Sequence, residues 1–432
     1  MTGRVARVLL NCLGLVAGVA VGGAACAGDS NTDLLSAEKI TVAADVRLVG
    51  VNGERSWLDG GFGKTRYGGE DAGRRSNFQL RPKFSDADLI WQPRLSWALS
   101  GTVVANLQDE PKLKVGLSEA FVSYKPLSES STRFSARAGL MWPPVSLEHS
   151  RPEWAVTETI TPSAINSWIG EEVKVVGAEM TGATSLGEHR LSATTGAFDV
   201  NDTAGAMIAY RGWALHDQKA TAFLRQPLPT LNSFIQYVQP RYSHPLKEMD
   251  HGFGNRVGYY VKLAWEPPAP VRLEAFHYDN HGDPLAVDKT LEWGWRTHFE
   301  DIGAVVDLSD STQIRTQALT GRTRMGAESN GAIWIDTRFR SAYALITRQL
   351  AKGSLSGRLE AFGTRNHGST LVRDDNEDGW ALTLAGRHEI NNNMTAQVEL
   401  LHVESARDAR RRDGLAPKQA QDLAQVALKL RW

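Results

Sequence analysis

Alternation of apolar and polar residues, with a period of two, recurs along nearly the whole chain and constrains the fold more than any other feature. In the final segment, "AQVALKLRW", an extended strand would carry Val426, Leu428, Leu430 and Trp432 on one face. The same pattern recurs in "LIWQPRLSWALSGTVVANL", "TRFSARAGLMW" and "NRVGYYVKLAW". A soluble two-faced sheet would show it once or twice. Repetition from end to end is typical of a membrane-spanning β-barrel.

The number of such segments is about sixteen, and an even number is what an antiparallel barrel with both termini on one side requires. No run of about 18 apolar residues follows the N-terminal segment, so no membrane-spanning helix is predicted. The thirteen tryptophans fit an aromatic girdle. Strands are predicted near 38–50, 76–84, 89–107, 116–125, 132–142, 172–184, 189–199, 256–266, 270–278, 290–308, 312–321, 331–350, 354–364, 378–389, 392–403 and 420–432.

The connections between these strands alternate between short and long. The short ones, such as "SDAD", "PLSESS", "EPPAP" and "INNN", are rich in turn-forming residues. Short periplasmic turns and long external loops are typical of a bacterial outer-membrane barrel. The predicted fold is therefore an all-β, transmembrane antiparallel barrel in the outer membrane, with long loops near 51–75, 143–171, 200–255, 279–289, 322–330, 365–377 and 404–419.

The N-terminal segment 1–27 reads as a secretory signal peptide, because two arginines precede a weakly polar run and a small-x-small cleavage site. Cleavage would leave 28–37 as a short periplasmic segment and 38–432 as the barrel. The alternative is a lipoprotein acylated at Cys26. Cys12 and Cys26 are the two cysteines of the sequence, so a mature chain starting at Gly28 would have no disulfide framework and no thiolate site.

One strand-to-loop junction, "GLMWPPVSLE" (139–148), resembles the corresponding junction of the phosphate-selective porin family (porins O and P). The resemblance implies a sixteen-stranded porin, a homotrimer, and a third loop, 143–171, that folds into the lumen and narrows it. The candidate constriction residues on that loop are Glu148, His149, Arg151, Glu153, Trp154 and Glu158.

The charges of this loop depart from the phosphate-selective pattern. Between 143 and 172 the sequence has five glutamates and one fixed cation, Arg151, whereas a phosphate filter needs several converging cations. Phosphate specificity is therefore not expected. Trp154 and Trp168 would either offer a stacking surface to a solute or anchor the loop on the inner wall.

Sorting charges by strand face predicts a lumen wall with about twice as many cations as acids, although the whole chain has a net charge of -1. A basic lumen concentrates anions, so a modest anion preference is predicted. The candidate pore-lining residues are Arg94, Arg133, Arg137, Lys262, Arg296, Arg338, Arg340 and Arg358.

These features predict a passive diffusion channel for small hydrophilic or anionic solutes. The alternatives are a closed or structural barrel and a barrel enzyme of the lipase or protease type, although no catalytic arrangement stands out. No cofactor is predicted. "DDNEDG" and "HYDNHGD" resemble metal-binding loops, but the first has Ala385 where calcium needs a glutamate, so no metal is predicted either.

The expected partners are outer-membrane lipid, lipopolysaccharide near "RDARRRDG", and the barrel-assembly machinery, which would read Leu428, Leu430 and Trp432. No nucleic-acid partner is expected.

Overall fold

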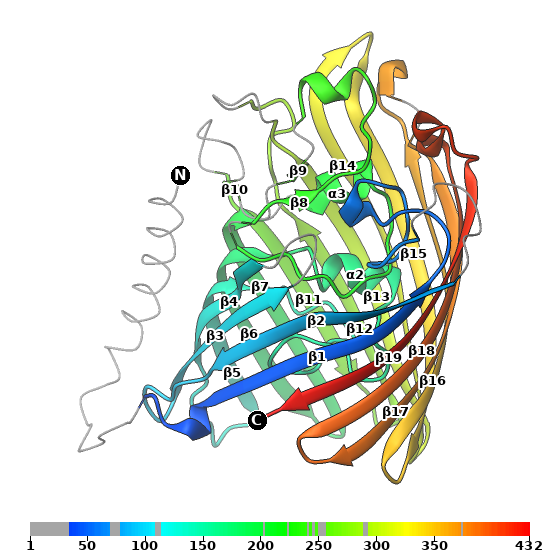
Figure 1. Cartoon of the computed structure of the whole chain (residues 1–432). Coiled ribbons are helices and arrows are strands. Elements are labelled where there is room, and N and C mark those ends of the chain that lie inside the picture. Colours follow the sequence, from blue (N-terminus) through cyan, green and yellow to red (C-terminus); the bar gives the residue numbers. More distant parts are fainter. Residues whose placement is uncertain are drawn as a thin grey trace.

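The strands form one closed antiparallel barrel (Figure 1). The sheet has seventeen strands, of which the two-residue β10 is a short addition at one edge and sixteen close the barrel. The computed structural model describes residues 34–69, 78–108, 114–201, 204–222, 224–239, 242–243, 247–248, 256–287, 293–372 and 375–432. The predicted signal peptide 1–27 lies outside these residues.

The sixteen barrel strands are β1 (Ile40–Val51), β2 (Gln79–Trp91), β3 (Leu99–Gln108), β4 (Lys114–Tyr124), β5 (Thr132–Met141), β6 (Val175–Leu186), β7 (His189–Asn201), β11 (Gly258–Glu266), β12 (Val271–Asp279), β13 (Arg296–Ser309), β14 (Thr312–Ser329), β15 (Ala332–Leu350), β16 (Gly353–Asn366), β17 (Glu377–Asn391), β18 (Met394–Arg407) and β19 (Lys418–Arg431). The shorter elements are η1 (Ala37–Lys39), η2 (Trp57–Asp59), α2 (Ala164–Ile169), α3 (Ala204–Tyr210), β8 (Gln226–Pro227), η3 (Ile235–Tyr237), β9 (Tyr242–Ser243), β10 (Lys247–Glu248), η4 (Thr370–Val372) and η5 (Asp408–Asp413).

The barrel closes where β19 pairs with β1, from Ala43 opposite Arg431 to Val51 opposite Leu423. Beyond the paired register, the backbone N–H groups of Trp432 and Val42 each donate to the other's carbonyl at 3.0 Å. These bonds satisfy backbone groups that an open sheet edge would leave exposed to lipid.

The predicted turn "SDAD" at 85–88 is wrong. Strand β2 runs through it, and the turn follows at 92–98, where Ser96 accepts hydrogen bonds from the Ala98 and Leu99 backbone. Asp86 and Asp88 are wall residues that face Lys219 inside the lumen. Three polar residues within four positions resemble a turn in sequence, but here Asp86 and Asp88 have a cation from a distant segment as their partner.

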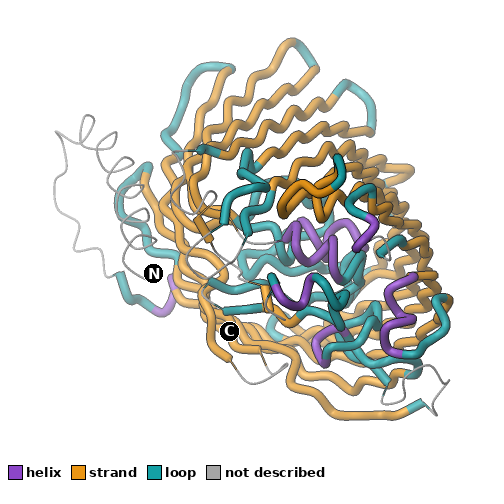
Figure 2. The backbone as a smooth tube through the Cα atoms, turned by 90° about the horizontal axis from the view of Figure 1, so that it is seen from above, coloured by secondary structure: helices purple, strands orange, loops and turns teal. Residues whose placement is uncertain are grey.

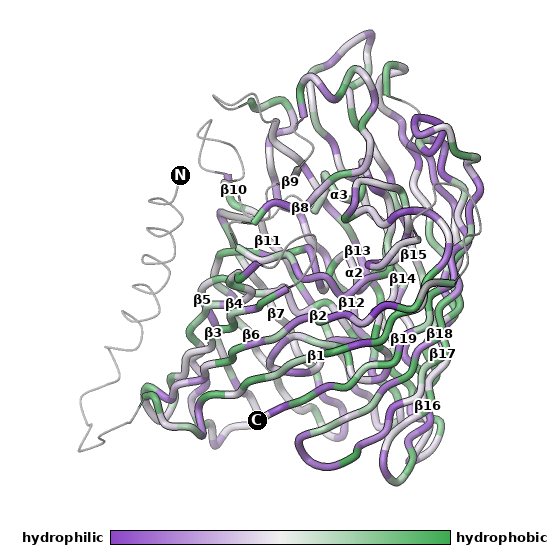
Figure 3. The backbone as a smooth tube through the Cα atoms, in the orientation of Figure 1, coloured by the Kyte–Doolittle hydropathy of each residue, from purple (hydrophilic) through white to green (hydrophobic). Residues whose placement is uncertain are grey.

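The exterior of the barrel is apolar around its middle. Leu263, Leu359, Leu384 and Val426 are half-exposed or more on the outer face, although they belong to strands whose opposite face is buried. Figure 3 shows the resulting alternation of hydrophilic and hydrophobic residues along the strands. The apolar belt makes this an outer-membrane barrel. Within the described ranges, no helix is long and apolar enough to cross a membrane.

Long connections fold into the barrel. Viewed from above, helices and loops occupy the space inside the ring of strands (Figure 2). The segment 142–174 between β5 and β6 carries α2, and the segment after β7 carries α3; every residue of both helices is buried. The lumen is therefore a packed interior over much of its height.

Candidate functional site

The third loop is held in the lumen by carboxylates of the barrel wall. Glu399 on β18 accepts hydrogen bonds from the backbone N–H of Ile160 and Thr161, at 2.7 and 2.9 Å. Glu360 on β16 accepts one from Ala164 at 2.6 Å. Bonds from an ionised acceptor to backbone donors are among the stronger hydrogen bonds, so the wall fixes the loop's path through the lumen.

Helix α2 begins at a serine cap. The Ser163 hydroxyl accepts from the Asn166 N–H at 3.2 Å, as an N-cap residue does. Glu148 accepts from the Ser163 N–H at 3.0 Å and from the Asn166 amide at 2.6 Å. Glu148 thus joins the start of the loop to its helix.

Arg358 on β16 is the central cation of this arrangement and is fully buried. Its guanidinium contacts Glu360 at 2.9 Å and Glu148 at 3.1 Å, and donates to the carbonyls of Thr161 and Pro162 at 2.9 and 3.0 Å. The planar guanidinium group has five N–H donors, so one side chain can bind carboxylates and backbone carbonyls at the same time.

The other constriction candidates also lie in the lumen. Glu158 accepts from Ser354 at 2.9 Å. Glu153 pairs with Arg431 of β19 at 2.9 Å, and Arg151 approaches Glu153 at 3.8 Å. The loop therefore meets the wall through ion pairs on several strands.

The two loop tryptophans serve as anchors in this structure. Trp168 is fully buried, with its ring centroid 5.2 Å from Phe299 and 4.9 Å from Phe339. Trp154 stacks on Trp142 at 6.1 Å and on His149 at 5.3 Å. The Trp154 indole N–H also donates to the Gly170 carbonyl at 2.6 Å, which fixes the ring against the end of α2.

The apolar cluster around Trp168 explains three wrong predictions. Arg296, Arg338 and Arg340 face outward, because Phe299 and Phe339 turn inward toward the loop. Apolar side chains alternate here as predicted, but they pack on a loop inside the barrel and do not face the lipid outside it. Alternation shows that two faces differ and does not show which face is the lumen.

The remaining pore-lining candidates divide into two groups. Four lie on the inner face: Arg133, Arg137, Lys262 and Arg358. Arg137 is paired with Glu179 at 2.7 Å, and Lys262 with Glu274 at 2.6 Å. The prediction for Arg94 is wrong, because it lies exposed in the turn at 92–98. Its sequence, "QPRLS", carries a proline that breaks the ladder and that marks the turn.

A second segment, 204–222, shares the lumen with the third loop. Arg211 forms a buried ion pair with Glu172, and the Trp213 N–H donates to Glu377 at 3.0 Å. The sequence predicts 200–255 as a long loop and assigns the constriction to 143–171, whereas residues of both segments lie in the lumen.

The connection that follows β1, described over residues 52–69, also reaches inward. Lys64 forms an ion pair with Glu377 and donates to the carbonyls of Arg211 and Trp213 at 3.2 and 3.0 Å. Burial lowers the pKa of Lys64 to about 7. Glu54 pairs with Arg410 of η5 at 2.6 Å. The sequence did not predict these contacts, because the partners are more than a hundred residues apart and no local pattern links them.

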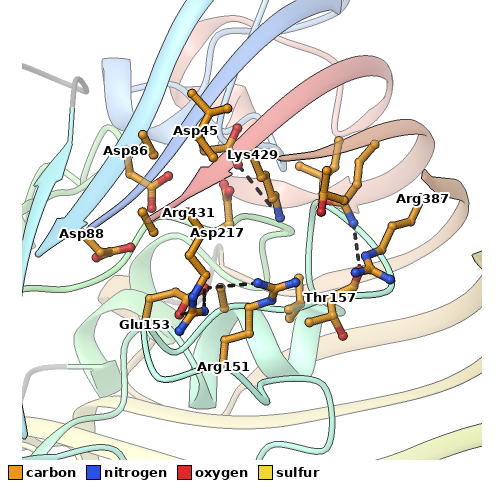
Figure 4. A pocket seen from close by; sticks show the side chains of 18 of the residues that line it. Asp45, Asp86, Asp88, Arg151, Glu153, Thr157, Asp217, Arg387, Lys429 and Arg431 are labelled. Atoms are coloured by element: carbon orange, nitrogen blue, oxygen red, sulfur yellow. Dashed lines mark hydrogen bonds and ion pairs between the residues drawn. The ribbon is translucent and has the colours of Figure 1, made fainter. Parts of the chain in front are cut away.

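Below the packed loops lies a polar cavity of about 450 Å³ (Figure 4). It opens toward the end of the barrel where β17 turns into β18, which is the short-turn, periplasmic end. Charges of both signs line it: the carboxylates Asp45, Asp86, Asp88, Glu153, Glu171, Asp217 and Glu389, and the cations Arg47, Arg151, Lys219, Arg387, Lys429 and Arg431.

Several cavity charges are paired. Arg47 and Arg66 both contact Asp217, and although burial alone would raise its pKa, they hold the pKa of this carboxyl well below its ordinary range. Lys219 lies 3.3 Å from Asp88 and 3.8 Å from Asp86. These carboxylates outweigh the effect of burial and raise the pKa of Lys219.

Glu171 and His149 form a neutral buried pair at the roof of the cavity. His149 Nε2 lies 2.9 Å from Glu171 Oε1, and His149 Nδ1 lies 2.7 Å from the Ser146 hydroxyl. Burial raises the pKa of Glu171 to about 8 and lowers the pKa of His149 to about 3. At neutral pH the protonated Glu171 therefore donates to His149, which donates to Ser146.

Charged side chains of the motif "HYDNHGD", which resembles a metal-binding loop, form other contacts. In "HYDNHGD", His277 pairs with Glu300 at 3.2 Å, Asp279 with Arg296 at 3.0 Å, and Asp283 is 3.1 Å from Arg256. Nowhere in the described ranges do three His, Cys, Asp or Glu side chains gather as metal ligands would. In "DDNEDG", Asp374 lies outside the described residues.

No protein-family model matches the sequence, and no curated protein does. Solved structures are similar in fold. The outer membrane channel DcaP of Acinetobacter baumannii has 8% identity over 92% of this chain and 99% of its own, with a TM-score of 0.52. An anion-selective porin from Comamonas acidovorans has 10% identity over 91% and 98%, with a TM-score of 0.48. At these identities the likeness to DcaP supports the barrel fold alone.

Proposed function

We propose that the protein is an outer-membrane channel for small hydrophilic solutes, and that its inward loops form the constriction. The observation that carries the proposal is the charged cavity at the periplasmic end of a sixteen-stranded barrel. Charged side chains inside a barrel cost folding energy unless they are paired or hydrated. A hydrated, charged inner surface is what a hydrophilic solute needs in a membrane pore.

The constriction is assigned to the third loop, 143–171. Its carboxylates and backbone groups bridge to β16, β18 and β19, so the loop crosses the lumen from one wall to the other. A solute passes only when this loop, or the segment 204–222 packed against it, moves.

The ion preference belongs to the same proposal. Three of the predicted wall cations face outward, and several inward ones pair with carboxylates. The cavity lining is close to balanced, with seven carboxylates and six fixed cations. We therefore expect an anion preference that is weak and no phosphate specificity, since no group of unpaired cations converges on one point of the described lining.

A closed, structural barrel is the second candidate, and the packing of the lumen favours it. The interior segments are joined to the wall by buried ion pairs and by the aromatic cluster around Trp168. Such a filling resembles a protein core more than a water-filled pore.

Conductance in a planar bilayer separates the two candidates. The purified wild-type barrel is compared with a variant lacking 153–167, which removes the middle of the third loop. A channel gives single-channel steps that grow markedly on deletion. Absence of conductance in both proteins, with both folded as heat-modifiable barrels, would overturn the channel proposal and favour the structural barrel.

A further inference from the structure

Arginines stand directly opposite one another on the outer wall of the barrel. His298 on β13, Arg322 on β14, Arg338 on β15 and Arg365 on β16 occupy one continuous register row. Side chains that face each other across neighbouring strands lie about 5 Å apart. Like charges in this position destabilise a sheet unless something neutralises them.

The neighbouring rows extend the same surface. Above, Arg296 stands opposite Arg324, and below, Arg340 stands opposite Thr320. We define the outer arginine patch as Arg296, His298, Arg322, Arg324, Arg338, Arg340 and Arg365.

All these side chains point away from the lumen. The residues between them along each strand, such as Phe299, Thr323 and Phe339, are buried inside the barrel. Arg338 and Arg340 are exposed.

Acidic residues compensate only part of this patch. Asp279 pairs with Arg296 at 3.0 Å, Asp336 with Arg322 at 2.6 Å and Asp378 with Arg365 at 2.6 Å. Across the described ranges, no carboxylate comes within ion-pair distance of Arg324, Arg338 or Arg340.

Three nitrogens of the patch also have no hydrogen-bond partner among the described residues: Nε of Arg296, Nε of Arg324 and Nδ1 of His298. Buried polar atoms without a partner are rare in native structures, so hydrogen bonding within the patch is incomplete.

The position of the patch along the barrel axis indicates which part of the membrane it faces. Four residues below His298, on the same face of β13, Ile302 is 63% exposed. On β15 the outward residues below Arg340 are Ala342, Ala344 and Ile346, until Arg348. Arg340 and Arg348 are eight residues apart, which is ~20 Å along the membrane normal for a strand tilted by ~40°.

That distance is close to the height of a barrel's apolar belt, which is ~25 Å. The patch therefore borders the belt at its upper edge, on the side of the long loops, where lipid headgroups begin. The loop "RDARRRDG" is a poorer site, because Arg410 pairs with Glu54 and Arg412 with Asp375 at 2.8 Å.

We propose that the outer arginine patch binds the phosphate groups of an anionic glycolipid in the external leaflet. Phosphate oxygens accept two parallel bonds from a guanidinium, and one diphosphorylated headgroup would span neighbouring arginines. The lipid's acyl chains would lie on the apolar belt below. The bound anion would remove the repulsion within the arginine row.

Native mass spectrometry of the full-length barrel tests this proposal, with diphosphorylated lipid A as the probe. The variant is R338Q/R340Q, which alters exposed side chains. R348Q is the matched control, because Arg348 lies on the same face of the same strand at the opposite edge of the belt. We expect retention of lipid A to fall about tenfold or more in R338Q/R340Q and to stay at the wild-type level in R348Q.

Equal lipid retention in all three proteins would overturn the proposal. So would equal retention of lipid A stripped of its phosphates, since acyl chains alone would then explain binding. Displacement of lipid A by millimolar inorganic phosphate would show a simple anion site and overturn the lipid assignment. If the wild type forms an oligomer without bound lipid and R338Q/R340Q dissociates that oligomer, then a second copy of the chain covers the patch instead of a lipid. Conductance is expected to stay unchanged throughout, so this test is independent of the channel proposal.

Discussion

Raising the pH from 6.5 to 8 should loosen the third loop through the ionisation of Glu171. This carboxyl is buried beside His149. The titratable groups around it are Lys219, Asp217, His216 and Asp86. Its Oε2 oxygen has no hydrogen-bond partner in the described part of the chain. An ionised Glu171 would leave that oxygen charged and unsolvated, so ionisation favours an undocked, hydrated loop.

The magnitude follows from the shifted pKa values. In the docked loop the pKa of Glu171 is raised from 4.5 to about 8, so the docked state holds one more proton between these limits and docking weakens as the pH rises. The pKa of His149 is lowered from 6.5 to about 3, so it strengthens docking as the pH rises from 3 to 6.5. The two effects cancel between 4.5 and 6.5, and above 6.5 the Glu171 effect remains, at about 1.4 kcal/mol per pH unit.

His149 is half titrated at pH 6.5 and Glu171 at pH 8, so between these pH values the ratio of undocked to docked loop should rise by about tenfold. The assay is open probability in planar bilayers at these two pH values. The matched variant is Glu171→Gln, which keeps a donor for His149 and cannot ionise. Lys64, whose pKa is about 7, titrates in both proteins, so the difference between their profiles isolates Glu171.

Identical pH profiles for the wild type and Glu171→Gln would refute this reasoning. They would show that the carboxyl is hydrated in the working channel or that docking of the third loop does not control the current.

Three further outcomes are expected. Replacing Arg358 with Met leaves Glu148 and Glu360 buried without their cation, which should destabilise the docked loop by about 3–5 kcal/mol. Single-channel recordings should then show larger and noisier conductance. Recordings identical to those of the wild type would contradict this expectation. Deleting Leu430 to Trp432 should abolish outer-membrane localisation and cause periplasmic degradation, as cell fractionation and heat-modifiability would show; a normal level of barrel would disprove this. A reversal potential across a KCl gradient should show weak anion preference, and a clear cation preference would show that the acidic third loop governs permeation.

Much of the fold could be predicted from the sequence because each strand carries its own alternation. The strand number is confirmed, and apart from the β2 to β3 region each predicted strand corresponds to an observed one. The error at "SDAD" arose because the partner of Asp86 and Asp88 is Lys219, more than a hundred residues away. Local patterns carry no information about such a partner.

The faces of the strands were harder to predict than the strands. Where the inward side chains are polar, as at Arg133 and Arg137, the prediction gives the correct face. Where the wall meets Trp168, the inward side chains are apolar and the two faces exchange their chemistry. The loop in the lumen therefore reverses the assignment of Arg338 and Arg340, which lie on the outer wall.

The pairing of β1 with β19 also sets an order of events. Val42 and Trp432 are almost the whole chain apart, and yet their backbones exchange two hydrogen bonds. This edge of β1 has no partner until β19, the last of the barrel strands described, is in place. During that interval β1 presents open donors and acceptors to any passing strand, and closing so long a loop carries the largest entropy cost of any strand pairing in the barrel. Substitutions at this seam should slow assembly far more than they weaken the finished barrel.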